Sequence, residues 1–125
     1  KEAETSIDTI SYAAHIAALL GAHIIKVKPP TSIISESSLE ENYNALISLN
    51  SLSERIKHIK KCAFNSKRIV VFSGGNAKGD EEILTEIKQI KDGGGNGSII
   101  GRNSFQRPKQ QALNLLNKII EIYKN

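Results

Sequence analysis

The sequence predicts an α/β fold with a parallel β-sheet, because short apolar runs alternate along it with amphipathic helical segments. The runs expected to be strands are residues 23–28, 68–72 and 97–101. Between them, apolar residues recur every three or four positions, which is the spacing of one face of a helix. Strands and helices that alternate in this way indicate βα units, and the expected order begins and ends with a helix.

The first expected helix follows Ser6 or Asp8, either of which can cap it, and ends at Gly21. Its apolar residues share one face: Ile7, Ile10, Ala14, Ala17 and Ala18. A second amphipathic helix is expected over residues 52–63, with its lysines turned to solvent. Its apolar face consists of Leu52, Ile56, Ile59 and Ala63.

Two further helices and a long connection complete the expected order. Asp80 is the expected N-cap of one helix, which ends at the glycines of residues 93–95. The last helix is expected over residues 108–123, with Pro108 in its first turn. Its apolar face consists of Leu116, Ile119, Ile120 and Tyr123. Residues 29–51 are serine-rich without a clean period, so we expect a long connection with one helical turn over residues 40–46.

Composition favours one soluble domain of 125 residues, with 39% hydrophobic and 24% charged residues. No apolar run approaches the ~20 residues that span a bilayer, so a membrane is not an expected partner. The first residues carry neither a signal peptide nor an initiator methionine, and we expect the chain to start within a longer protein.

The cysteine and charge content indicate the expected location and partners of the protein. A single cysteine, Cys62, allows no internal disulfide, which fits a cytoplasmic location, and we expect Cys62 to be a packed, unreactive side chain. The net charge of +4 comes from basic and acidic residues that are interleaved along the chain. This pattern favours a solvated surface, and no nucleic-acid partner is expected.

Glycines follow two of the expected strands. Ser73, Gly74 and Gly75 come directly after residues 68–72, and their amides and hydroxyl can point at phosphate oxygens. After the next strand, Gly101 permits close approach and Arg102 offers a planar fork of donors suited to phosphate. The next residues, Asn103 or Ser104, can cap a short helix. Each feature alone is compatible with an ordinary turn, but together they match the phosphate cradle that (β/α)8 barrels build after their last two strands.

Two lysines lie two positions apart in the first expected strand, "HIIKVK". Side chains two apart point to the same face, so Lys26 and Lys28 share one face with Ile24. Inside a barrel this face would look into the lumen, where burial and mutual repulsion are expected to lower at least one lysine pKa. A neutral lysine is a nucleophile toward carbonyls. The strand sequence alone is equally consistent with two lysines on an exposed sheet edge, where their charge prevents aggregation.

Three stretches carry a family resemblance: "GAHIIKVK", "VVFSGGNAKGDEE" and "GGGNGSIIGRNSFQRP", in this order and spacing. They resemble the C-terminal part of class I, Schiff-base fructose-bisphosphate aldolases of the archaeal and bacterial type, relatives of deoxyribose-phosphate aldolase. The resemblance extends over nearly the whole chain. It implies an α/β fold that is the C-terminal portion of a (β/α)8 TIM barrel, with residues 1–125 supplying strands six to eight and the N-terminal half absent.

The resemblance also implies an activity, the reversible cleavage of fructose 1,6-bisphosphate in glycolysis and gluconeogenesis. Lys26 matches the family's Schiff-base lysine, and Lys28 would be its electrostatic neighbour. The substrate phosphate would bind to Ser73, Gly74, Gly75, Gly101 and Arg102. No metal or other cofactor is implied, because the iminium serves as the electron sink. His23 stands where the family often has an acidic residue, but its side chain points away from the expected lumen.

The partners that follow are a phosphorylated sugar, further copies of the chain in a homo-oligomer, and the missing half of the barrel. The acid and base groups of catalysis would lie on that half, and we expect His15, His23 and His58 to be surface or packing residues. Two alternatives remain open from sequence. One is a related aldolase, transaldolase-like or thiolase-like, acting on another phosphorylated ketone. The other is a non-catalytic, flavodoxin-like domain whose glycine loops bind phosphate.

Overall fold

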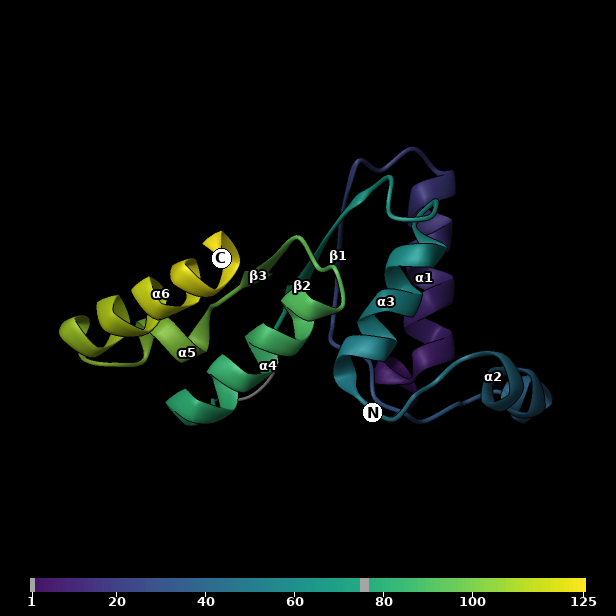
Figure 1. The fold of residues 1–125 in the computed structure, drawn as a ribbon, viewed down its shortest axis with the longest axis horizontal. Helices are drawn as coiled ribbons and strands as arrows, with labels where there is room; N and C mark the ends of the chain where they lie inside the picture. Colours follow the sequence, from purple (N-terminus) through teal and green to yellow (C-terminus); the bar gives the residue numbers. More distant parts are fainter. Residues whose placement is uncertain (1, 75–76) are drawn as a thin grey trace.

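The structure, a computed structural model, describes residues 2–74 and 77–125 and contains helices and one three-stranded sheet (Figure 1). In chain order the elements are η1 Ala3–Thr5, α1 Ile7–Leu19, β1 Ile24–Val27, η2 Ser37–Leu39, α2 Glu40–Leu46, α3 Leu52–Cys62, β2 Ile69–Ser73, α4 Asp80–Asp92, β3 Gly97–Ile99, α5 Arg102–Phe105 and α6 Lys109–Lys124. The alternation of strands and helices predicted from sequence is confirmed, and so is the helical turn of the long connection, which is α2.

All strand pairs are parallel, in the spatial order β1-β2-β3. Lys26 of β1 is the register partner of Val71 in β2, and Val71 is in turn the partner of Gly97 in β3. In Figure 1, α1 and α3 lie side by side next to β1, whereas α5 and α6 lie beyond β3. Strand order follows chain order, which is the arrangement of consecutive βα units in an α/β barrel.

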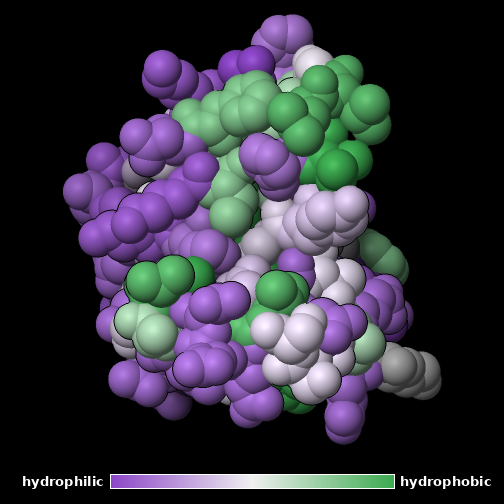
Figure 2. All heavy atoms as spheres, turned by 90° about the vertical axis from the view of Figure 1, so that its right-hand side faces the viewer, coloured by the Kyte–Doolittle hydropathy of each residue, from purple (hydrophilic) through white to green (hydrophobic). Residues whose placement is uncertain are grey.

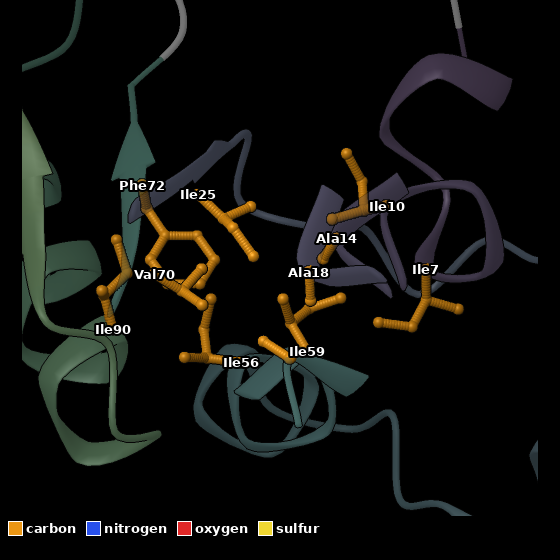
Figure 3. Packing of buried hydrophobic residues seen from close by; sticks show 11 residues of the cluster. Ile7, Ile10, Ala14, Ala18, Ile25, Ile56, Ile59, Val70, Phe72 and Ile90 are labelled. Carbon is orange, nitrogen blue, oxygen red and sulfur yellow. The ribbon is translucent and has the colours of Figure 1, made fainter. Parts of the chain in front are cut away.

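One face of the sheet packs against helices and the other face is open. Ile25, Val70 and Phe72 are buried, and Figure 3 shows them pointing toward Ile56 and Ile59 of α3. The apolar face predicted for α1 joins the same cluster, through Ile7, Ile10, Ala14 and Ala18. Burying each Ile or Phe side chain stabilises the fold by about 1.5–3 kcal/mol.

The opposite face of the sheet carries apolar side chains that remain exposed. The exposed fractions are 64% for Ile24, 46% for Ile69 and 46% for Ile99, one residue from each strand. These residues alternate with the buried ones, as the two-residue period of a strand requires. The apolar run of the second strand is typical of a strand buried on both faces, but within this chain only its helix-facing side is buried.

A second cluster joins α4 to α6. Ile83 and Ile87 of α4 pack against Leu115 and Ile119 of α6, and all four are buried. The apolar face predicted for α6 is therefore displaced by about one residue at its N-terminal end, because Leu115 is buried and Leu116 is half-buried. Ile120, at 49% exposure, faces away from this cluster.

Two details of the helices differ from the sequence predictions. Lys60 of α3 is buried rather than solvent-exposed, because its ammonium donates to the carbonyl of Arg68 (2.8 Å) and to Oδ1 of Asn96. Burial lowers the pKa of Lys60. The N-cap of α4 is Gly79, and Asp80 is the first helical residue, with its carboxylate paired to Arg107. Both differences arise from contacts with residues far away in the sequence, which the apolar pattern of a single helix cannot reveal.

The surface around α1 and α2 is mainly hydrophilic. Figure 2 views the molecule from that side, and apolar side chains gather mostly near its upper edge. Single large apolar residues are exposed on these helices, among them Tyr12 and Leu20 of the α1 segment and Leu46 of α2.

Asp8 binds the long connection, residues 29–51, to the start of α1. Its carboxylate is buried and accepts hydrogen bonds from the amides of Ser35 (3.0 Å) and Glu36 (2.9 Å) and from the Ser35 hydroxyl. Burial alone would raise the pKa of Asp8, but the hydrogen bonds from Ser35, Ser6 and Glu36 outweigh burial and hold the pKa well below its usual range. Ser6, rather than Asp8, is the N-cap residue of α1.

Asp8→Ala is expected to lower the free energy of unfolding by about 2 kcal/mol, because buried amides lose a charged acceptor. A group with a depressed folded pKa stabilises the protein above its unfolded pKa, near about 3.9, and loses that effect as pH falls toward the folded pKa. The stability difference from the wild-type chain should therefore be constant above pH ~5 and shrink below pH ~4. Urea unfolding at several pH values measures it. Glu41→Gln, on exposed α2, is the control, and a pH-independent difference would contradict the assignment.

Gly93 ends α4 where that helix meets α3 closely. A Cβ atom at this position would lie 2.5 Å from both Ile56 Cβ and the Ser53 carbonyl oxygen. The backbone conformation itself is ordinary, with φ −76°, so the need for glycine is steric. Gly93, predicted to end this helix, thus also lies at the contact between α3 and α4.

Gly93→Ala is expected to destabilise the chain by about 1–3 kcal/mol, because the added methyl group forces the helices apart. The matched variant is Gly79→Ala, where a Cβ would meet nothing within 4 Å. Thermal unfolding of the two variants checks the prediction. Equal melting temperatures would show that α3 and α4 do not approach as closely as described.

Candidate active site

The carboxyl ends of the three parallel strands meet at one edge of the sheet, and the residues predicted from sequence gather there. Lys26 and Lys28 lie at the end of β1, Ser73 is the last residue of β2, and Gly101 and Arg102 follow β3. Parallel pairing is what brings these segments together, since each strand ends at the same edge.

Lys26 lies on the open face of the sheet, opposite the buried side chain of Ile25. Its neighbour across the strands, Val71, is half-buried, and the next position is Gly97, which has no side chain to cover it. Lys26 is exposed in this chain. The partly desolvated lumen expected from sequence is not formed by these residues, because no element of the described chain covers this face.

Lys28 shares that face but is already paired. Its ammonium lies 2.5 Å from Oε1 of Glu4, which belongs to η1. Both side chains are about half exposed, so the pair contributes little to stability. Glu4 could not be found from the sequence pattern, because its contact with Lys28 depends on the tertiary position of the N-terminal turn.

A cavity of about 230 Å³ lies between the loops after β2 and β3. Its lining includes Ser73, Gly74, Gly101 and Arg102, all of which the sequence analysis predicted, together with Asn103. Gly75, also predicted, lies outside the described residues. The volume exceeds that of a single water several times over and is sufficient for a phosphate-sized group.

The short helix predicted after β3 is present as α5, but its N-cap is Gly101 rather than Asn103 or Ser104. Asn103 is buried inside the helix, and its Oδ1 accepts a hydrogen bond from the amide of Lys78 (2.8 Å) in the other loop. The Ser104 hydroxyl donates back to the carbonyl of Gly101 (2.9 Å). Asn103 therefore links the two loops, whereas Ser104 bonds within its own loop.

Lys78, which sequence analysis did not single out, borders the site from the loop before α4. Its ammonium pairs with Glu86 and, at 3.7 Å, with Glu82. Burial alone would lower the pKa of Lys78, but the hydrogen bond and charge of Glu86, with those of Glu82, raise it. Lys78 is thus a charged residue fixed to α4.

The remaining titratable candidates lie among the helices. The His58 ring stacks edge-on against Tyr43, and burial lowers the pKa of His58. Burial raises the pKa of the Cys62 thiol, as expected for a packed, unreactive cysteine. His15 is fixed by a 2.9 Å contact between its Nδ1 and the carbonyl of Cys62. The described residues contain no cluster of three or more His, Cys, Asp or Glu side chains able to hold a metal ion.

A model of the DeoC/LacD family of aldolases matches residues 1–107. The chain belongs to the DeoC/LacD aldolase family. The strand ends described above are thus those of an α/β aldolase, in agreement with the resemblance found in the sequence. Every helix within residues 2–74 and 77–125 is too short or too polar to cross a lipid bilayer.

Curated relatives within this family carry a more specific name. The chain is 32% identical over 127 residues to a probable fructose-bisphosphate aldolase class 1 of Chlamydia muridarum, and 34% identical over 100 residues to a fructose-bisphosphate aldolase class 1 of Halobacterium salinarum. These alignments cover 95% and 80% of the chain, but only 36% and 30% of the relatives. The chain therefore spans about a third of the length of the relatives that it matches.

Solved structures agree with the fold. A crystal structure of an archaeal fructose 1,6-bisphosphate aldolase matches with a TM-score of 0.72 and 27% identity, covering 98% of this chain and 40% of that one. A fructose-bisphosphate aldolase from Slackia heliotrinireducens matches in fold with a TM-score of 0.68 at 21% identity, with 37% of its chain covered. The α/β arrangement of this aldolase chain corresponds to the C-terminal part of a TIM barrel, as predicted.

Proposed function

We propose that this chain supplies strands six to eight of a (β/α)8 barrel that acts as a class I fructose-bisphosphate aldolase. The observation that carries the proposal is the arrangement along one sheet, where Lys26 lies on the open face of β1 and a cavity lies at the ends of β2 and β3. Ser73, Gly74, Gly101 and Arg102 line this cavity. The names of the curated relatives support the choice of substrate.

In this proposal Lys26 is the nucleophile. Its neutral amine adds to the ketone carbon, water leaves, and a protonated iminium joins lysine and substrate. A base on the rest of the barrel takes the proton of the C4 hydroxyl, and the bond between C3 and C4 breaks. Glyceraldehyde 3-phosphate leaves as the aldehyde, and the electron pair of the broken bond moves toward the iminium, which becomes an enamine. Protonation of the enamine carbon and hydrolysis then return dihydroxyacetone phosphate and free Lys26.

The phosphate next to the reacting ketone would bind in the cavity between the two glycine loops. Arg102 supplies a guanidinium at its rim, and Gly74 and Gly101 let backbone amides approach the oxygens closely. Lys28, which is paired with Glu4 in this chain, would be the electrostatic neighbour of Lys26 on the same strand face.

The other strands of the barrel would complete the active site. Strands one to five would cover the exposed side chains of Ile24, Ile69 and Ile99 and contribute the acid and base groups. We further propose a cytoplasmic enzyme of glycolysis and gluconeogenesis that functions as a homo-oligomer. No metal is required in this scheme, because the iminium accepts the electrons.

The test uses the complete barrel, meaning this chain together with the segment that supplies its other strands. Cleavage of fructose 1,6-bisphosphate is measured with a chelator present, before and after borohydride treatment with dihydroxyacetone phosphate. The proposal predicts activity that resists the chelator and is lost only when ketone and borohydride are added together. Activity on a different phosphorylated ketose would retain the mechanism and reassign the substrate, whereas borohydride-insensitive cleavage would overturn the mechanism.

A further inference from the structure

Arg107 lies in the turn between α5 and α6, and its guanidinium contacts both loops of the proposed phosphate site. Nε donates to the carbonyl of Asn103 at 2.6 Å, and Nη2 donates to the carbonyl of Lys78 at 2.8 Å. Nη1 pairs with the carboxylate of Asp80, at the start of α4. Only 18% of the Arg107 side chain is exposed, so these contacts are largely shielded from water.

A second link runs between the same loops. The amide of Lys78 donates to Oδ1 of the buried Asn103 at 2.8 Å. Together with the Arg107 contact, this fixes both the N–H and the C=O of Lys78 to the segment that follows β3. The side chain of Lys78 is held separately, by Glu86 of α4.

The charges in this network are already matched. Asp80 neutralises Arg107 and Glu86 neutralises Lys78. Arg102 lines the cavity itself. Arg107 is not among the residues that line it. Its contribution to ligand binding must therefore be geometric, since its donors are occupied by the protein's own oxygens.

We infer that Arg107 is a positioning residue that fixes the distance between the loops after β2 and β3, and so makes the phosphate cavity one preorganised site. The inference rests on the proposed function and deepens it. A site that must contact one anion from two loops depends on their separation, because a displacement of about 1 Å can cost on the order of a hundredfold in rate. Lysine cannot replace Arg107, because it lacks the planar fork that reaches three oxygens.

The first test measures binding without chemistry. Inorganic phosphate is titrated into the complete barrel by calorimetry, for the wild type, Arg107→Lys and Arg107→Ala, with Lys109→Ala as an exposed control nearby. Both Arg107 variants should bind phosphate at least about tenfold more weakly, with the control unchanged. Unaltered affinity in the variants overturns the inference, whatever the catalytic activity.

The second test separates positioning from a loss of folding. Borohydride trapping is compared for dihydroxyacetone phosphate and for dihydroxyacetone, which lacks the phosphate. Arg107→Ala should raise the half-saturating concentration of the phosphorylated ketone only, and added guanidinium should restore it. Equal losses with both ketones overturn the inference and indicate a folding role. If the wild type forms no adduct, the proposed function fails, and the phosphate titration alone decides the role of Arg107.

Discussion

Lys26→Ala is expected to abolish aldol cleavage in the complete barrel, with kcat falling on the order of a thousandfold or more. The reason is chemical, because alanine cannot form the iminium on which the proposed route depends. Thermal unfolding should change little, since Lys26 is not part of the apolar clusters formed by the described residues. Steady-state kinetics on fructose 1,6-bisphosphate measures the effect.

Two lysine variants make the comparison specific. Lys28→Ala removes the other ammonium of the same strand face and is expected to slow cleavage without stopping it. Lys57→Ala removes an exposed lysine of α3 and should leave kcat unchanged. If Lys26→Ala retained activity within tenfold of the wild type while Lys28→Ala lost it, the roles assigned to the two lysines would be reversed.

Arg102→Ala is expected to raise the KM for fructose 1,6-bisphosphate by about ten- to a hundredfold, with a smaller effect on kcat. Hydrogen bonds to a charged group contribute about 1.5–3 kcal/mol, and Arg102 is the guanidinium that lines the cavity between the glycine loops. Arg102→Lys keeps the charge but loses the planar fork, so an intermediate KM is expected. Initial rates over a range of substrate concentrations give both constants.

The control for Arg102 is Lys118→Ala, which removes a charge from the exposed side of α6. Its KM should equal that of the wild type. A rise of similar size in both variants would attribute the effect to net charge rather than to the cavity, and an unchanged KM in Arg102→Ala would remove Arg102 from the phosphate site.

The strands and most helix faces could be predicted because their patterns are local. Alternation of Ile25 and Val27 with the lysines, and the spacing of Ile56 and Ile59, depend only on neighbours in sequence. The position of Lys60 could not be predicted in this way. Its place on the helix looks solvent-facing, but the carbonyl of Arg68 and the side chain of Asn96 lie where they can satisfy its ammonium.

In the site, too, features that depend on local sequence were predictable, and contacts between distant residues were not. The position of the glycines and Arg102 at one edge of the sheet was predictable, because parallel strands end at the same edge. The partners that hold these loops, such as Asn103, Lys78 and Arg107, were not, because each acts across a separation of about 25 residues or more along the chain.

The most direct measurement locates the covalent adduct. The complete barrel is incubated with dihydroxyacetone phosphate, reduced with borohydride and digested, and mass spectrometry maps the modified peptide. The proposed mechanism predicts one adduct, on Lys26, that is absent when borohydride or ketone is omitted. An adduct on Lys28 or any other lysine, or none on an enzyme that is active, would contradict it.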